Sequence, residues 1–273
     1  MNYYVFFIDI EEDWREILLG WLSELPFDTY EETETGWAAY LPESENKAAV
    51  ESVLGELQQQ HAFSWNSEFI PAQNWNAVWE ANFQPIIVED FCGVRADFHP
   101  PFSGLAYELV IQPKMAFGTG HHETTYMMMA AMRHLPLNDA RVFDYGCGTG
   151  ILAILAAKMG AATIDAVDIE TESVVNTREN AQINHINNVN VYEGDLTAAP
   201  AGPYDVILAN INRNVILDSL PALYGKTSPG GILLVSGILL ADADMVRAAA
   251  QQQGFSFQQQ WQRGAWAAIE FRA

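Results

Sequence analysis

The chain has 273 residues, of which 49% are hydrophobic, so it is long enough to bury a large core and to form two domains. Its 35 acidic and 13 basic side chains give a formal net charge of −22, which argues against a protein that grips nucleic acid through phosphate contacts. The acidity either serves solubility alone or attracts a basic partner.

Cysteine usage and the N-terminal segment indicate the cellular compartment of the protein. Cys92 and Cys147 lie far apart, so we expect no structural disulfide, and two cysteines are too few ligands for a metal site. The opening M-N-Y-Y-V-F-F-I-D-I-E-E-D lacks the basic region of a signal peptide. No apolar run approaches the roughly 20 residues of a membrane span. We therefore expect a cytoplasmic protein with no membrane anchor and no metal.

The first seventy residues predict a small α+β domain, which we place at residues 1–72. Alternating apolar positions predict strands at Tyr3–Ile10, Phe27–Thr33, Trp37–Leu41 and Phe63–Ile70, and helical periodicity predicts helices at Glu12–Ser23 and Lys47–Gln60. The order βαββαβ is that of a ferredoxin-like domain, in which two helices cover one face of an antiparallel sheet. The other face is free to meet a partner.

Residues 73–113 predict a linker with a few ordered pieces, including short strands at Ile86–Val88 and Val94–Asp97. Trp75 and Trp79 are four residues apart, the spacing of neighbours on one helix face. We expect these tryptophans to pack between two lobes rather than to contact a ligand.

Residues 114–273 predict a doubly wound α/β domain. Seven strands, most of them separated by helical segments, are expected at Val142–Tyr145, Thr163–Val167, Asn190–Glu193, Val206–Ala209, Ile232–Ser236, Phe255–Trp261 and Ala265–Phe271. Alternation of strand and helix predicts a mostly parallel sheet. The last two strands leave no room for a helix between them, so we expect them to form an antiparallel hairpin.

The most informative segment is Val142–Gly150, V-F-D-Y-G-C-G-T-G, which joins an apolar strand to a glycine-rich turn. Gly146, Gly148 and Gly150 let the backbone turn sharply and approach a ligand closely. The following stretch, Ile151–Met159, is helical in pattern, so its first N–H groups would point back at the ligand. The segment predicts a binding loop for a nucleoside cofactor.

The spacing within this loop separates two cofactor classes. A dinucleotide fingerprint, G-x-G-x-x-G, needs a third small residue where Ile151 stands. The loop instead reads D-x-G-x-G-x-G from Asp144 and resembles the first motif of class I S-adenosylmethionine-dependent methyltransferases.

A second carboxylate, Asp168, follows the predicted strand Thr163–Val167, roughly twenty residues beyond the first glycine. An acid at this place accepts hydrogen bonds from both ribose hydroxyls of a nucleoside. The alternative role is that of a cap for the helix that begins near Thr171. The order of strand, loop, helix, strand and acid favours ribose binding.

Two further segments sharpen the resemblance: Met115–Thr125, M-A-F-G-T-G-H-H-E-T-T, and Leu208–Val215, L-A-N-I-N-R-N-V. Together with D-Y-G-C-G-T-G-I-L-A-I, they resemble the ribosomal protein L11 methyltransferase family. The resemblance covers almost the whole chain. It implies a seven-stranded, doubly wound class I methyltransferase domain that follows a small ferredoxin-like domain for substrate recognition and a linker.

The resemblance also implies which residues bind the cofactor. Positions that match S-adenosylmethionine contacts of the family are Thr125, Gly146, Asp168 and Asn210, with Gly148 in the same loop and Phe117 and Gly118 beside the methionine end. The chain departs from the common pattern at His121 and Glu123, in place of Thr and Pro, and at Asn212 and Arg213, in place of Leu and Ala. These departures bear on the fine geometry of the substrate.

The chemistry of methyl transfer sets the demands on the site. An in-line displacement at a sulfonium needs the nucleophile aligned and close, without a metal or a covalent intermediate. The amine must be neutral, which at pH 7 costs about 4.6 kcal/mol for a lysine and about 1 kcal/mol for an α-amine. Asn210 is our candidate catalytic residue, because its side-chain oxygen or the adjoining carbonyls can accept the hydrogen bonds of the amine and orient its lone pair. His122 is either a base or a structural residue of its loop.

Three hypotheses for the function remain. The favoured one is a monomeric protein N-methyltransferase that acts on lysine side chains and the N-terminal α-amino group of ribosomal protein L11, a basic client, without reading nucleic acid. A second keeps the fold with another protein, glutamine or a small molecule as substrate, or is a base-modifying enzyme. A base-modifying enzyme would favour N-P-P-Y, which Asn210, Ile211 and Asn212 do not match. A third is a noncatalytic, ribosome-associated protein that binds S-adenosylmethionine.

Overall fold

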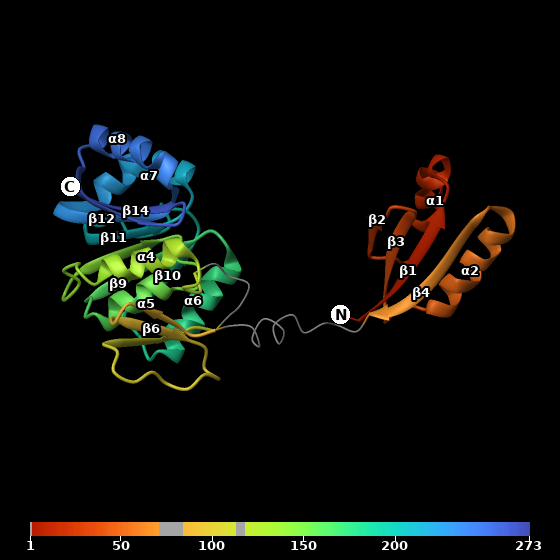
Figure 1. The fold of residues 1–273 in the computed structure, drawn as a ribbon, viewed down its shortest axis with the longest axis horizontal. Helices are drawn as coiled ribbons and strands as arrows, with labels where there is room; N and C mark the ends of the chain where they lie inside the picture. Colours follow the sequence, from red (N-terminus) through yellow and green to blue (C-terminus); the bar gives the residue numbers. More distant parts are fainter. Residues whose placement is uncertain (1, 71–83, 113–117) are drawn as a thin grey trace. The chain divides into compact units, whose positions relative to one another are not determined.

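The computed structural model describes residues 2–70, 84–112 and 118–273. Contacts divide the chain into two compact units, Met1–Val78 and Trp79–Ala273 (Figure 1). The expected packing of Trp75 and Trp79 and the expected cofactor contact of Phe117 lie outside the described residues. No helix within the described ranges is long and apolar enough to cross a membrane.

The N-terminal unit has the predicted order βαββαβ. Its elements are β1 (Tyr3–Ile10), a short 3-10 helix (Glu12–Trp14), α1 (Arg15–Leu22), β2 (Thr29–Glu32), β3 (Gly36–Pro42), α2 (Lys47–Gln60) and β4 (Phe63–Ile70). The strands form an antiparallel sheet in the order β2-β3-β1-β4. The single helix predicted at Glu12–Ser23 is a 3-10 turn followed by α1.

Both helices of this unit pack against the same face of its sheet. Leu18 and Leu22 of α1 and Leu54 of α2 share one buried cluster with Phe6 and Ile8 of β1. Burial of such side chains stabilises the unit by about 1.5–3 kcal/mol each.

Residues 84–112 form a small sheet of their own, β5-β6-β7, from Ile86–Val88, Cys92–Arg95 and Tyr107–Val110. The sequence predicted two short strands here and missed β7. Val88 and Leu109 belong to the large apolar cluster of the second unit. Asn184 fixes β7 in place, since its side chain accepts from the backbone N–H of Val110 at 3.0 Å and donates to the Val110 carbonyl at 2.6 Å. This segment therefore packs as part of the C-terminal unit.

The C-terminal unit is built on the predicted seven-stranded sheet. Its order is β10-β9-β8-β11-β12-β14-β13. The strands are β8 (Arg141–Tyr145), β9 (Thr163–Asp168), β10 (Val189–Glu193), β11 (Tyr204–Asn210), β12 (Thr227–Leu239), β13 (Ser256–Arg263) and β14 (Trp266–Arg272). The first five strands run parallel, and β14 is antiparallel to both of its neighbours. The predicted terminal hairpin is confirmed.

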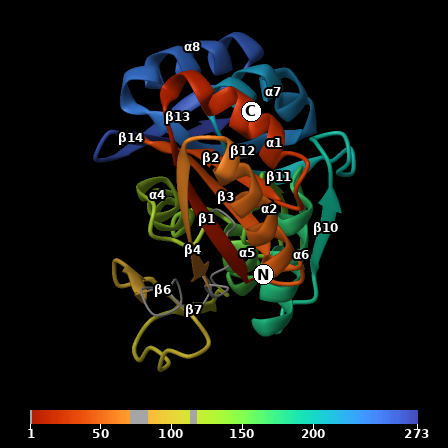
Figure 2. The same cartoon turned by 90° about the vertical axis from the view of Figure 1, so that its right-hand side faces the viewer.

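Helices cover both faces of this sheet, as the two views show (Figures 1 and 2). They are α4 (Glu123–Met132), α5 (Ile151–Lys158), α6 (Thr171–Ile183), α7 (Arg213–Lys226) and α8 (Ala243–Gln253), with a 3-10 turn at Leu240–Asp242. Side chains of α4 and α5 enter one apolar cluster, and those of α7 and α8 enter a second. Six consecutive residues of α5, Ile151 to Ala156, are buried, because this helix is apolar on every side.

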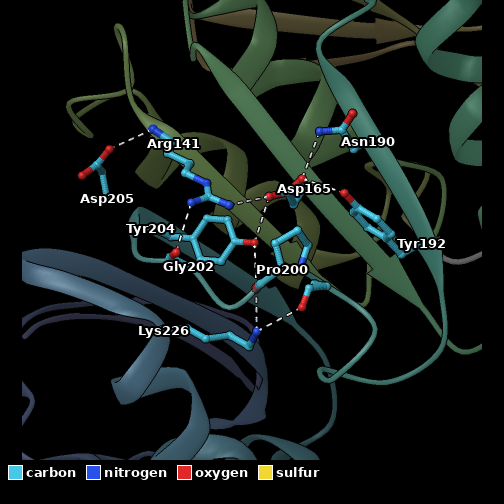
Figure 3. Close-up of polar contacts among 10 residues, drawn as sticks. Arg141, Asp165, Asn190, Tyr192, Pro200, Gly202, Tyr204, Asp205 and Lys226 are labelled. Carbon is cyan, nitrogen blue, oxygen red and sulfur yellow. Dashed lines mark hydrogen bonds and ion pairs between the residues drawn. The ribbon is translucent and has the colours of Figure 1, made fainter.

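A buried carboxylate joins four neighbouring strands of the sheet (Figure 3). Asp165 of β9 accepts from the hydroxyl of Tyr204 at 2.9 Å, the amide of Asn190 at 3.0 Å and the hydroxyl of Tyr192 at 3.3 Å. Arg141 of β8 forms an ion pair with the same carboxylate at 3.3 Å. Burial and the Asp165 carboxylate raise the pKa of Tyr204, so this phenol remains a donor. The network fixes the relative positions of the strands whose opposite ends form the candidate site.

Candidate active site

The order of the sheet places a crevice at the carboxyl ends of β8 and β11. From these two strands the chain winds outward in opposite directions, and ligands of doubly wound folds bind at such a switch point. A cavity of about 860 Å³ lies there. The ends of the parallel strands contribute Tyr145, Asp168 and Asn210 to its wall, and His122 and Trp266 close another side.

The glycine loop between β8 and α5 makes the predicted sharp turn, through left-handed backbone conformations. Gly146, Gly148 and Gly150 have φ values of +76°, +55° and +78°. A Cβ on Gly146 would lie 2.3 Å from Cγ2 of Ile211, which lines the same cavity. Gly146 and Gly148 also line the cavity. The loop therefore needs glycine both for its conformation and for the approach of Ile211.

Asp168, at the end of β9, holds the glycine loop and faces the cavity. One carboxylate oxygen accepts from the backbone N–H of Gly148 at 2.8 Å, and the other accepts from that of Glu170 at 3.0 Å. Glu170, not Asp168, is the N-cap residue of α6, and Asp168 meets that helix through the backbone N–H of its N-cap residue. A carboxylate has about four acceptor positions, which leaves two for ribose hydroxyls.

Asn210 ends β11 and is held by Thr125 of α4. Its Nδ2 donates to Oγ1 of Thr125 at 3.1 Å. Its Oδ1 is buried and has no hydrogen-bond partner among the residues that the structure describes. A buried acceptor left in this state costs about 1–3 kcal/mol, which a ligand that donates a hydrogen bond would recover. Thr125 is fully buried behind this residue and does not line the cavity.

Asp144, the first residue of the glycine motif, lies under the loop rather than on the cavity wall. Its Oδ2 accepts from the backbone N–H of Ala153 in the first turn of α5 at 3.1 Å. Its Oδ1 is a second buried oxygen without a partner in the described part of the chain. Complete burial raises the pKa of this carboxyl to about 7.

His122 has the structural role that the sequence left open beside catalysis. It is the N-cap residue of α4, and its Nδ1 accepts from the backbone N–H of Thr124 at 3.3 Å. Its ring meets the ring of Trp266 edge to face, with centroids 4.8 Å apart. Sequence reasoning missed Trp266, because only the pairing of β14 with β12 and β13 brings it to the cavity.

The segment before α4 contacts the glycine loop. The hydroxyl of Thr149 donates to the carbonyl of Gly118 at 2.5 Å. Gly118 has a φ of +101° and does not line the cavity itself. It supports the loop, and its contact with the methionine end of the cofactor stays a prediction. The cofactor contacts of Gly146, Gly148, Asp168 and Asn210 also stay predictions.

The four departures from the family pattern have local roles. Asn212 is the N-cap of α7 and accepts from the backbone N–H of Val215 at 3.1 Å. Arg213 pairs with Asp242 at 2.9 Å. Glu123 begins α4, where its charge suits the positive end of the helix dipole. His121 is hydrogen-bonded through Nδ1 to the hydroxyl of Thr119 at 3.2 Å, and burial lowers its pKa.

The chain matches known proteins over nearly its whole length. The family model of ribosomal protein L11 methyltransferase (PrmA) matches residues 21–273. The chain is 42% identical over 260 residues to a ribosomal protein L11 methyltransferase of Porphyromonas gingivalis, covering 94% of this chain and 90% of the relative. It is 34% identical to one of Bacteroides fragilis, covering 99% of both chains.

Solved structures agree with the fold. A ribosomal protein L11 methylase from Lactobacillus delbrueckii subsp. bulgaricus superposes with a TM-score of 0.63 at 29% identity, covering 69% of this chain and 98% of that chain. A methyltransferase from Pyrococcus furiosus, at 16% identity and a TM-score of 0.53, shares the fold. The glycine loop, the strand-end acid and the comparisons lead to one conclusion: the chain belongs to the ribosomal protein L11 methyltransferase family, whose members are S-adenosylmethionine-dependent methyltransferases.

Proposed function

We propose that this chain transfers methyl groups from S-adenosylmethionine to lysine side chains and to the N-terminal α-amino group of ribosomal protein L11, the substrate in the names of its relatives. The observation that carries the proposal is the amide of Asn210. Its Oδ1 is a buried acceptor without a partner among the described residues, on the wall of the cavity at the switch point.

The cavity residues fit S-adenosylmethionine. Asp168 has acceptor positions for the ribose hydroxyls, and the loop at Gly146 and Gly148 allows close approach of a ligand to the backbone. When bound, the cofactor supplies an electrophilic methyl group. The protein supplies the position and the surroundings of the nucleophile.

Asn210 orients the target amine in this proposal. A neutral amine donates a hydrogen bond to Oδ1, and its lone pair is then directed by the fixed amide. Ile211, Val215 and Trp266 form an apolar wall beside it. Removal of water by such a wall lowers the pKa of an amine, which reduces the cost of the neutral form. Fixed geometry then provides much of the rate enhancement.

We assign the N-terminal unit to the ferredoxin-like class and give it the task of client recognition. The βαββαβ order and the strand order β2-β3-β1-β4 support this assignment. The domain limits that we derive from sequence are 1–72, 73–113 for the linker and 114–273; contacts group residues 79–273 together. A cytoplasmic monomer that recognises protein rather than nucleic acid completes the proposal, and the net charge of −22 favours a basic client.

One labelling experiment tests this function. Unmodified ribosomal proteins are incubated with the protein and S-adenosylmethionine that carries a labelled methyl group, and the labelled residues are found by mass spectrometry. We expect label on amines of ribosomal protein L11. Label confined to RNA, or to other proteins, would contradict the proposed substrate. Cofactor binding without any transfer would select the noncatalytic alternative.

A further inference from the structure

Negative charge is concentrated in the N-terminal unit. Residues 1–70 contain fifteen Asp and Glu side chains but only two cationic ones, Arg15 and Lys47. Carboxylates of the same unit already engage both cations: Arg15 pairs with Glu32 at 3.2 Å, and Lys47 pairs with Glu51 at 2.7 Å. The unit therefore presents an excess of carboxylates to its surroundings.

The sheet of this unit has one face that no helix among the described residues 2–70 covers. Both helices pack on the face that carries Phe6 and Ile8. Because side chains alternate along a strand, Tyr3 and Phe7 of β1 lie on the opposite face. The strand register places Tyr40 of β3 and Glu68 of β4 on either side of Val5, and hence on this same face.

Tyrosines and carboxylates are linked on this open face. The hydroxyl of Tyr3 donates to Asp28 at 3.0 Å, and that of Tyr40 donates to Glu31 at 2.8 Å. The two rings meet edge to face with centroids 6.3 Å apart. The hydrogen-bonded carboxylates raise the pKa of both tyrosines, so each phenol stays protonated and keeps its carboxylate in place.

We propose that this tyrosine–carboxylate face docks a lysine- and arginine-rich surface of the protein client. The face consists of Tyr3, Phe7, Asp28, Glu31, Tyr40 and Glu68. The inference rests on the proposed function and adds to it the surface that recognises the client. Aromatic rings hold the aliphatic stems of lysine and arginine, and carboxylates hold the charged ends.

Charge complementarity selects this occupant. A protein that lies on ribosomal RNA is basic where it neutralises phosphates, and such a surface complements the carboxylates of this face. A second copy of the chain would bring the same negative face into contact with itself, which costs free energy. The face therefore favours a basic protein over self-association.

The test compares two double variants of the full chain that change the charge equally. Glu31→Gln with Glu68→Gln alters the docking face, and Glu24→Gln with Glu56→Gln alters exposed positions on the helical side. We expect the first pair to lower kcat/KM for ribosomal protein L11 about tenfold through KM, with kcat and cofactor affinity unchanged. The kcat/KM of this first variant should also depend less on salt concentration than that of the wild type. The control pair should stay within about twofold of the wild type.

A binding measurement separates this inference from the proposed function. Fluorescence anisotropy of labelled ribosomal protein L11 reports docking on the full chain whether or not methyl transfer follows. Tight binding without transfer would overturn the proposed function alone. Equal binding by the wild type and the Glu31/Glu68 variant, or an equal loss in the control variant, would overturn the docking face alone. Absence of binding by the wild type would overturn both.

Discussion

Asn210 and Thr125 are joined by a hydrogen bond of 3.1 Å from the amide Nδ2 to the hydroxyl Oγ1. The bond fixes the amide, so that its oxygen is the atom left without a protein partner in the described structure. We therefore propose that Thr125 acts through Asn210, as a positioning residue rather than as a direct contact of the cofactor.

Thr125→Val removes this acceptor while keeping the shape of the side chain. The amide of Asn210 should then rotate, and kcat should fall by about tenfold to a hundredfold, since small misplacements are costly in methyl transfer. Cofactor affinity should change little. Steady-state kinetics and calorimetry measure the two effects, with Thr125→Ser as the control that keeps the hydroxyl. A kcat for the valine variant equal to that of the wild type would remove Thr125 from the mechanism.

Asp168→Ala should weaken cofactor binding by about 1.5–3 kcal/mol, the usual value for hydrogen bonds to a charged group. The carboxylate also holds the backbone N–H of Gly148 at 2.8 Å, so the loop loses support as well. Calorimetry measures the affinity, and Glu170→Gln provides a control on the same cavity wall. Unchanged affinity in Asp168→Ala would refute its assignment to the ribose.

Gly146→Val should abolish cofactor binding. A side chain there must adopt a φ of +76° and would place its Cβ 2.3 Å from Ile211. Gly230→Val is a matched control, because Gly230 has a φ of +77° and no heavy atom within 4 Å of the added Cβ. The control variant should lose only the stability that backbone strain costs, about 1–2 kcal/mol. Equal cofactor binding by the two folded variants would show that contact with Ile211 does not matter.

Asp144 should make stability depend on pH. Burial raises its pKa to about 7 in the folded protein, against about 3.9 in an unfolded chain. The folded state therefore binds the proton more tightly. Protonation of Asp144 therefore adds up to about 4 kcal/mol to the free energy of unfolding. This contribution is complete below pH 4 and is lost as the pH rises to 7.

Asp144→Asn removes this titration. Urea denaturation between pH 5 and pH 8 measures the free energy of unfolding of the variant and of the wild type. The value for the variant should rise relative to that for the wild type as the pH rises. A difference between the two proteins that stays constant over this range would mean that Asp144 does not titrate there.

A fragment of residues 79–273 should bind S-adenosylmethionine but not methylate the client. Both large apolar clusters of the catalytic unit lie within this range, so the fragment retains its core. We expect the fragment to lose only the labelling of the client. Its cofactor affinity should stay within about twofold of that of the full chain. Labelling equal to that of the full chain would assign the N-terminal unit another task.

The sequence predicted much of the architecture because its signals are local. Alternating and helical patterns predict βαββαβ and the seven strands, and left-handed turns need the glycines of Val142–Gly150. The sequence also identified Asp168 and Asn210 as strand-end residues. Since parallel strands end at one edge of a sheet, both side chains reach one cavity.

Other features depended on contacts between distant segments. Trp266 reaches the cavity only through the pairing of β14, and the hydrogen bond between Asn210 and Thr125 joins residues that are 85 positions apart in the sequence. Strand β7 exists because Asn184 and β6 hold its backbone. The unpartnered oxygen of Asp144 likewise results from burial beneath α5. Burial and partners are properties of the packed chain, so no local pattern contains them.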